Sequence, residues 1–381
     1  MASSSSVIGA AREAATVVAK HQDSAERDRR LAPEVVEACR DAGLYLLAAP
    51  TEAGGVEASL RDVFDATEMI AQADPSASWY VTNSMAACHA AAWIDPEFYE
   101  PLYASNGGNF GFSAAPGGRL TPTEGGYRLS GEWPLVTGVS DATYAALNTL
   151  LPRPEAKGML LRLCLVPTAE MTIDEVWNEA AAMRGTGSHR VEIDDTFVPE
   201  TLAVDLAAPP LLNRPRFAGI GVPHVGGVAN TAVSVGVFQA ALDALGDELR
   251  GKVSTISGAK ATDMASVMEL VAHARAALVT LRYGTYGVID ELWASAQTGD
   301  GPTLTQRADA VGMQFHASKV AREFISELYS RSSRAAFFND HPLERALRNI
   351  HAIAYAFEPL RTIQHDIGRL AIGIEPKIPR F

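Results

Sequence analysis

The stretch GYRLSGEWPLVTG, residues 126–138, decides the fold class of this chain. It follows a glycine turn and lies among other short, turn-bounded segments rich in aromatic and aliphatic residues. No helical period separates these segments, so they are predicted to be strands, at 127–129, 144–151, 159–166 and 190–197. The middle of the chain is therefore predicted to form a small β-barrel or sandwich.

Both flanks of this β-rich region are predicted to be helical. Ala-rich, charged sequence covers residues 7–42, and further helices are expected at 59–73 and 76–93. Beyond residue 222, apolar residues recur at spacings of 4, 3, 4 and 3, which is typical of helices packed at shallow angles. The chain is thus predicted to be α+β and mostly α. Its expected parts are an N-terminal helical domain (1–105), a central β domain (106–212) and a C-terminal four-helix bundle (213–381).

Composition excludes several classes of function. The formal net charge is -13 and no cluster of Lys and Arg occurs, so binding to nucleic acid or an anionic membrane is not expected. The three cysteines are far apart and lack zinc-type spacing, so neither a metal site nor a disulfide framework is predicted. No signal peptide or membrane span is recognised. A soluble, cytoplasmic protein is the expectation.

The common nucleotide-binding and hydrolytic motifs are not found. The nearest approach to a dinucleotide fingerprint is GIGVPHVG at 219–226, but its spacing is wrong and no strand–turn–helix unit surrounds it. We interpret it as a loop that enters a helix at Gly227. A Rossmann domain is therefore not predicted, and a redox cofactor would have to be held in another way.

Four segments, taken in order, carry a family resemblance. They are LAPEVVEACRDAGL at 31–44, DPSASW at 74–79, GYRLSGEWPLVTG at 126–138, and MRGTGS at 183–188 leading into VEIDDTFVP. Their order and spacing resemble the acyl-CoA dehydrogenase superfamily over nearly the whole chain.

Within that superfamily the chain more closely resembles the two-component flavin-dependent monooxygenases, of the dibenzothiophene monooxygenase-like and phenol hydroxylase-like branch. The segments at 133–138 and 184–188, and PLERALRN at 342–349, favour this branch. The glutamate loop of true acyl-CoA dehydrogenases is not found near the C-terminus. Removal of a proton α to a thioester therefore has no obvious base.

The resemblance implies an oxygenase. Reduced flavin, FMN or FAD, would come from a separate reductase, and O₂ would be the co-substrate. One oxygen atom would pass to a small aromatic or heteroatom-containing metabolite while the protein excludes water. The flavin would lie between the β domain and the bundle, and a homotetramer is expected.

The resemblance also implies which residues meet the flavin. A hydroxyl of Thr137 would bond a flavin heteroatom, and Gly138 would allow close approach. For each position a structural role remains open: a core Trp, a Gly-rich loop, a plain turn, or an ion pair within the bundle. The predicted flavin contacts are Ser113, Ala114, Trp133, Thr137, Gly138, Arg184, Ser188 and Arg282. Further candidate phosphate ligands, with the same ion-pair alternative, are Arg307, Arg345 and Arg348.

A substrate pocket is implied on the helix that follows Asp74. Trp79, Asn83 and His89 are predicted to line it, and His89 joins Thr137 as a predicted catalytic residue. The alternative for His89 is a hydrogen-bonded core histidine.

The C-terminal helix departs from the pattern of the relatives. Many of them carry a histidine base eight residues after the arginine of an RD motif; here that position is Ala356, and Asn349 replaces the Asp. Phenol hydroxylation through a histidine base is therefore disfavoured. Amines, sulfur atoms and reactive rings become the expected targets.

Two alternatives remain open from the sequence. The first is an acyl-CoA dehydrogenase-like enzyme with a relocated base, for which Glu323, Glu327 and Glu358 are candidates that no motif places. The second is a catalytically silent member of the fold.

Overall fold

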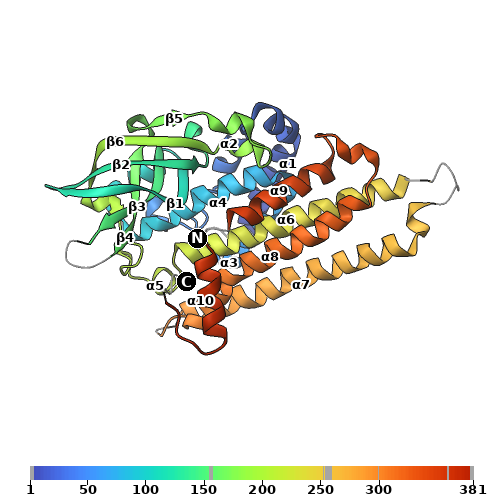
Figure 1. Cartoon of the computed structure of the whole chain (residues 1–381). Helices are drawn as coiled ribbons and strands as arrows, with labels where there is room; N and C mark the ends of the chain where they lie inside the picture. Colours follow the sequence, from blue (N-terminus) through green and yellow to red (C-terminus); the bar gives the residue numbers. More distant parts are fainter. Residues whose placement is uncertain are drawn as a thin grey trace.

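The predicted strands form one sheet in the middle of the chain (Figure 1). Its strand order is β5-β6-β2-β1-β3-β4-β7. The strands are β1 (Phe110–Thr123), β2 (Gly126–Val136), β3 (Tyr144–Pro152), β4 (Met159–Pro167), β5 (Thr172–Asp174), β6 (His189–Pro199) and β7 (Ala203–Val204). This computed structural model describes residues 4–153, 158–251, 253, 260–298, 300–357 and 360–377.

The sheet is curved towards a barrel. β1 and β3 are parallel, and the other pairs of neighbouring strands are antiparallel. β4 and β6 touch although three strands lie between them in the sheet. The β-rich middle predicted from residues 126–138 is thus confirmed, as a single curved seven-stranded sheet.

A buried tryptophan explains the glycine pair of β1. Trp133 of β2 is fully buried, and its Nε1 donates to the carbonyl of Asn148, 2.9 Å away. A Cβ on Gly117 would lie 2.7 Å from the indole, and one on Gly118 would lie 2.4 Å from it. Only glycine leaves room for the ring at these positions, because real Cβ contacts are not this short.

Polar side chains cap the N-termini of two of the N-terminal helices. Ser59 accepts from the Asp62 N–H at the start of one helix, and Asp74 accepts from the Ser76 N–H, 2.7 Å away, at the start of the next. The helices are α1 (Ser4–Asp28), α2 (Pro33–Asp41), α3 (Leu60–Ala73) and α4 (Pro75–His89).

The C-terminal helices form the predicted bundle. Its four members are α6 (Val222–Gly251), α7 (Ala265–Ala296), α8 (Leu304–Ser330) and α9 (Pro342–Ala356). The short α5 (Pro215–Gly219) precedes them, and α10 (Arg361–Ala371) follows. α6 begins at Val222, so the predicted helix entry at Gly227 was wrong by five residues. α6 is the one described helix long and apolar enough to cross a membrane by length and composition, and 78% of its most apolar window is buried inside the molecule.

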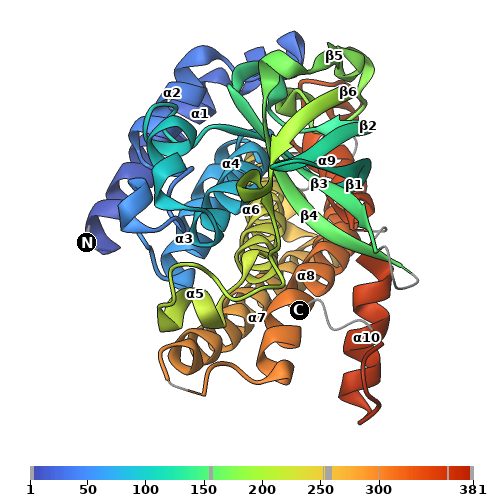
Figure 2. The ribbon, with the colours of Figure 1, turned by 90° about the vertical axis from the view of Figure 1, so that its left-hand side faces the viewer.

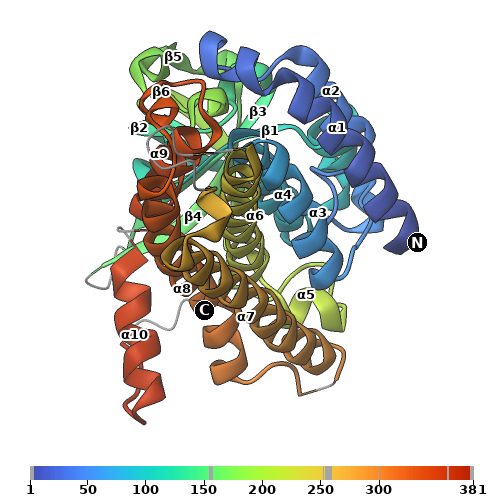
Figure 3. The same cartoon turned by 90° about the vertical axis from the view of Figure 1, so that its right-hand side faces the viewer.

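Helix α4 connects the sheet with the bundle. It contacts β1 on one side and α6 on the other, as two views at right angles to Figure 1 also show (Figures 2 and 3). α9 packs on α6 and α8, whereas α10 contacts α8 at the margin of the bundle. The turn at residues 184–186 also contacts α4, so α4 borders both β1 and the segment that carries the predicted flavin contacts Arg184 and Ser188.

Candidate functional site

Three hydroxyl groups meet where the sheet faces the helices. Thr137 follows the end of β2, and Thr186 and Ser188 lie in the turn that leads into β6. The Oγ of Ser188 is 2.9 Å from the Oγ1 of Thr137 and 2.8 Å from the Oγ1 of Thr186. All three side chains are buried. The structure therefore brings the predicted residues Thr137 and Ser188 into direct contact.

The turn at residues 183–188 has an unusual backbone. Met183 has φ of 51° and Gly187 has φ of 52°. The left-handed conformation is costly for a residue with a side chain, and it persists where surrounding contacts hold it. Here the Met183 N–H donates to the Oδ1 of Asn349 on α9, 2.8 Å away, and the Met183 carbonyl accepts from the Nε1 of Trp177, 3.0 Å away.

Gly138 is required for packing inside the protein. Its φ is 75°, and a Cβ there would lie 2.6 Å from the ring of Tyr80 on α4. Its N–H donates to the carbonyl of Thr186, 3.2 Å away. Gly138 thus joins the end of β2 to the turn and lets α4 approach both.

The predicted arginines are engaged in ion pairs. Glu26 of α1 pairs with Arg184 and also with Arg348 of α9, and all three side chains are largely buried. Arg282 pairs with Glu68 of α3 inside the helical region. These contacts favour the ion-pair alternative for Arg184 and Arg282. Arg345 likewise pairs with Asp23 at 2.8 Å.

Strand β1 presents small residues beside the hydroxyl cluster. The backbone of Phe112 forms a two-way bridge with Thr137, so Ser113 lies close to the cluster. Ser113 is buried and Ala114 is exposed, and the pairing of β1 with β3 is interrupted between Ser113 and Gly118. Trp133, in contrast, is packed in the sheet core, as its structural alternative expects.

The three predicted pocket residues of α4 do not share one face. Trp79 and Asn83 are one helical turn apart, and the Asn83 Nδ2 donates to the Trp79 carbonyl. Trp79 packs against Phe357, with 6.2 Å between the ring centroids. His89 is about 80° around the helix axis from Trp79, at 100° per residue. Trp79 and Asn83 thus lie on one side of α4, and Trp79 contacts Phe357, the residue that follows α9.

His89 lies in the core. It is fully buried, with Nδ1 2.9 Å from the Ala48 carbonyl and Nε2 2.8 Å from the Ile220 carbonyl. Burial lowers the pKa of His89 to about 4, against the two carbonyls, which favour the protonated ring. Both ring nitrogens are occupied by backbone, so this placement favours the core-histidine alternative over a catalytic role.

The carboxylates proposed for a relocated dehydrogenase base are poorly placed. Glu323 and Glu327 are exposed on α8. Glu358 lies outside the described residues. Ala356 is exposed at the end of α9, and His351, five residues before it, is also exposed. In the described part of the chain, no group of three or more His, Cys, Asp or Glu is placed to hold a metal ion.

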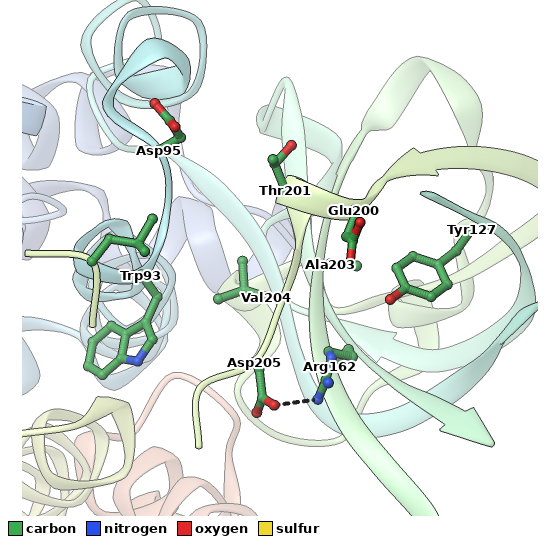
Figure 4. Close-up of a pocket in the computed structure, with 10 residues that line it drawn as sticks. Trp93, Asp95, Tyr127, Arg162, Glu200, Thr201, Ala203, Val204 and Asp205 are labelled. Atoms are coloured by element: carbon green, nitrogen blue, oxygen red, sulfur yellow. Dashed lines mark ion pairs between the residues drawn. The ribbon is translucent and has the colours of Figure 1, made fainter. Parts of the chain in front are cut away.

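Two surface hollows lie away from the hydroxyl cluster. One, of about 280 Å³, is bordered by Trp93, Tyr127 and the segment 200–205, where Arg162 pairs with Asp205 at 2.9 Å (Figure 4). The other, of about 490 Å³, lies between α5 and the α7–α8 loop and includes Arg307. Neither is lined by Thr137 or Ser188.

Sequence comparison assigns the chain to a family. The model for the acyl-CoA dehydrogenase N-terminal domain matches residues 8–94, and the model for the acyl-CoA dehydrogenase C-terminal domain matches residues 228–357. Together these ranges span more than half of the chain. The chain belongs to the acyl-CoA dehydrogenase family.

Relatives within this family are monooxygenases. Indole-3-acetate monooxygenase of Pseudomonas putida is 27% identical over 358 residues, covering 92% of this chain and 90% of that protein. The flavin-dependent monooxygenase oxygenase subunit HsaA of Rhodococcus jostii is 26% identical, covering 91% and 93%. The predicted resemblance to flavin-dependent monooxygenases is thereby confirmed.

A solved structure shows the same fold. XiaF from Streptomyces, in complex with FADH₂ and glycerol, superposes with a TM-score of 0.87 at 22% identity, covering 99% of this chain and 98% of that one. The predicted acyl-CoA dehydrogenase-like fold is confirmed.

Sequence reasoning missed the residues that hold the turn. The segment 183–188 contributed Arg184 and Ser188 to the predicted flavin contacts, but Met183, Trp177 and Asn349 were given no role in holding it. The signal available was the departure at Asn349, in a helix that lies more than 160 residues away along the chain. Nothing in the sequence indicated that this side chain reaches the Met183 N–H.

Proposed function

We propose that this chain is the oxygenase component of a two-component flavin-dependent monooxygenase. The observation that carries the proposal is the 2.9 Å contact between Thr137 and Ser188, which joins the segment after β2 to the turn before β6 and brings two predicted flavin contacts together. Two relatives that match more than nine-tenths of the chain are monooxygenases, which supports the same activity.

The residues present fit a flat, polar heterocycle. The buried hydroxyls of Thr137 and Ser188 offer hydrogen bonds, and the small residues Ser113 and Ala114 lie beside them on β1. Reduced flavin, when bound, would supply the electrons that activate O₂. The chain would bind the ring, orient the substrate from the α4–α9 side and exclude water. Ser113, Ala114, Thr137, Gly138 and Ser188 are the proposed flavin-site residues.

We further propose a substrate that needs no deprotonation. Ala356 occupies the position where many relatives place a histidine, and the aromatic contact of Trp79 with Phe357 adjoins it. An aromatic ring that is already electron-rich, a sulfur atom or an amine suits such a site. Trp79 and Asn83 are the proposed substrate contacts.

The test is an anaerobic titration with reduced FMN and reduced FAD, followed by a pulse of ¹⁸O₂ with indole, thioether, amine and phenol panels. We expect saturable binding of at least one reduced flavin and ¹⁸O in the product. Product without the label would contradict the proposed activity. Bleaching of bound oxidised flavin by acyl thioesters would instead support the dehydrogenase alternative.

A matched pair of variants connects the titration to the site. Thr137→Val removes the hydroxyl at nearly constant volume, whereas Thr137→Ser keeps it. Loss of one buried hydrogen bond costs about 1–1.5 kcal/mol, which corresponds to roughly tenfold weaker binding. Equal affinity of Thr137→Val and the wild type would place the flavin elsewhere.

The description of the HsaA relative as an oxygenase subunit supports a separate reductase as a partner. We propose a separate flavin reductase, a cytoplasmic location and a homotetramer. Tyr283 and Tyr355 are exposed aromatic side chains on the helices of the bundle, and they support burial against further copies of the chain.

A further inference from the structure

We propose that Thr186 fixes the direction of a hydrogen-bond chain that ends at Thr137, so that the site accepts N–H donors and favours reduced over oxidised flavin. This inference rests on the proposed function, since it concerns how the same hydroxyl cluster distinguishes two states of one ligand. Thr186 is thereby a positioning residue: it contacts Ser188 and Met183, and it affects the ligand through Ser188 and Thr137.

The direction follows from counting protons. The Thr186 hydroxyl is 3.0 Å from the carbonyl oxygen of Met183, and a carbonyl can only accept. Thr186 therefore donates its one hydroxyl proton to the Met183 carbonyl. Its 2.8 Å contact with Ser188 then requires the Ser188 proton, and the 2.9 Å contact between Ser188 and Thr137 requires the Thr137 proton.

The end of this chain is an acceptor. Each hydroxyl has one proton and two lone pairs, so once its proton is committed a hydroxyl can only accept. Thr137 retains a free lone pair, and no proton is left for a ligand. Thr186 and Ser188 are buried behind Thr137, so a ligand meets the hydrogen-bond chain at Thr137.

The Met183 carbonyl is a firm anchor for the chain. It accepts from the Thr186 hydroxyl, from the Thr186 N–H at 3.1 Å and from Trp177 Nε1 at 3.0 Å. On its other side, the Met183 N–H is held by Asn349. These contacts fix the position of the carbonyl, and reversal of the chain would withdraw the Thr186 hydroxyl from it and leave only the two N–H donors.

Reduction of a flavin gives its ring the N–H donor that an acceptor such as Thr137 requires. Two-electron reduction converts a ring nitrogen that only accepts hydrogen bonds into one that carries N–H. A hydroxyl that can only accept forms a hydrogen bond with that N–H. It forms none with a ring nitrogen that has no proton, because two lone pairs then face and repel each other. The fixed direction therefore favours the reduced ring by about the value of one hydrogen bond.

The critical variant is Thr186→Val, which is close to Thr in volume. Without the Thr186 hydroxyl, Ser188 can donate to Thr137, and the Thr137 proton becomes free for a bare nitrogen. Thr186→Ser keeps the hydroxyl and serves as the matched control. Circular dichroism and the unfolding temperature of the flavin-free proteins establish that all three forms are folded; if Thr186→Val is not, Thr186→Ala takes its place.

The measurement is the ratio of the dissociation constants of oxidised and reduced FMN, or of FAD if that is the flavin bound, together with the midpoint potential of the bound flavin. We expect Thr186→Val to lower the preference for reduced flavin about tenfold, which moves the two-electron potential about 30 mV more negative. Thr186→Ser should match the wild type.

The possible outcomes separate the two proposals. If the wild type binds flavin and Thr186→Val has the same ratio of dissociation constants for oxidised and reduced flavin, the directional role is overturned and the proposed function stands. An equal change in Thr186→Ser would overturn it as well, because that variant retains the hydroxyl. Wild type that binds neither flavin in either state would overturn both proposals.

Discussion

Asn349 shows how one side chain holds a distant turn in place. It is fully buried on α9, and its Oδ1 accepts the N–H of Met183, the residue in the left-handed conformation. The preceding residue, Arg348, donates to the Ala181 carbonyl at 3.2 Å. Arg348 and Asn349, two consecutive residues of α9, thus form hydrogen bonds to Ala181 and Met183, in the segment that leads to Ser188.

We predict that Asn349→Leu weakens flavin binding and Asn349→Asp does not. Leu leaves the Met183 N–H buried without an acceptor, which costs about 1–3 kcal/mol, whereas Asp supplies an acceptor at the same place. The Nδ2 of Asn349 has no hydrogen-bond partner among the described residues, so Asp gives up no contact there. Titration with reduced FMN and FAD measures the effect.

The result would be contradicted in either of two ways. Asn349→Leu could bind flavin as tightly as wild type, or Asn349→Asp could be as impaired as Asn349→Leu. Thermal unfolding of the flavin-free forms distinguishes loss of the turn from loss of the whole fold.

Residue types at the site were more predictable than their partners. Thr137 and Ser188 were identified because a family pattern places small hydroxyl residues at fixed strand and turn positions. Arg184 and Arg282 were assigned to the flavin, but each has a carboxylate partner from another helix. A sequence shows that an arginine is present but not which distant carboxylate neutralises it, so ion pairs between helices could not be predicted.

At the scale of elements, close helix packing depends on one glycine of α6. A Cβ on Gly236 would lie 2.6 Å from the Cβ of Ala71 and 2.8 Å from the Glu68 carbonyl, both on α3. Gly246, on the same helix, has only the flexible tip of Arg250 nearby, at 3.5 Å. These two glycines form a matched pair for measuring the α3–α6 contact.

We predict opposite effects of alanine at these positions. Gly236→Ala should destabilise the protein by about 1–3 kcal/mol, because the helices must move apart. Gly246→Ala should stabilise it by up to about 1 kcal/mol, since alanine is the better helix former. Chemical denaturation of the two variants tests this, and equal effects would show that α3 and α6 are not tightly packed at Gly236.

Elements were predicted well where the pattern was long or regular. The strands predicted at 144–151, 159–166 and 190–197 match β3, β4 and β6, and the loop between α7 and α8 carries Gly and Pro, whereas the strand predicted at 127–129 covers only part of β2. The start of α6 was misplaced because Gly226 and Gly227 resemble a break. In the structure Gly227 packs against α8, where its Cβ would lie 3.2 Å from Val311. Tertiary packing, and not backbone freedom, accounts for that glycine.

At the scale of the whole molecule, two buried histidines make stability depend on pH. Burial lowers the pKa of His89 to about 4 and that of His224 to about 3, from an ordinary value of 6.5. Below pH 6.5 the unfolded chain binds protons that the folded chain excludes, so stability falls as pH falls. Burial raises the pKa of Asp74 to about 6, and this group acts in the opposite sense.

We predict that His89 and His224 together lower the free energy of unfolding by a few kcal/mol between pH 7 and pH 5, a contribution that the raised pKa values of Asp65, Asp74 and Asp141 partly offset. Urea denaturation at both pH values measures it. His224→Asn should make stability less dependent on pH, because asparagine does not titrate. Asparagine is chosen because its side-chain carbonyl can accept the Gly221 N–H, which His224 Nδ1 accepts at 2.8 Å. The exposed His273→Asn is the control, and an equal flattening by both would exclude the buried-histidine explanation.

The order of helices, sheet and bundle was predictable because each part has its own sequence period. How the parts meet was not, since the contacts of Glu26, Thr186 and Asn349 join segments that no local pattern relates.

The position of Glu26 between Arg184 and Arg348 sets a limit on the order of events during synthesis. A ribosome makes the first helix early, the turn midway and α9 near the end. The turn therefore lacks its Asn349 and Arg348 partners until almost all of the polypeptide has emerged. The proposed cofactor can be acquired only after translation is nearly complete, and chains truncated before α9 should be released without it.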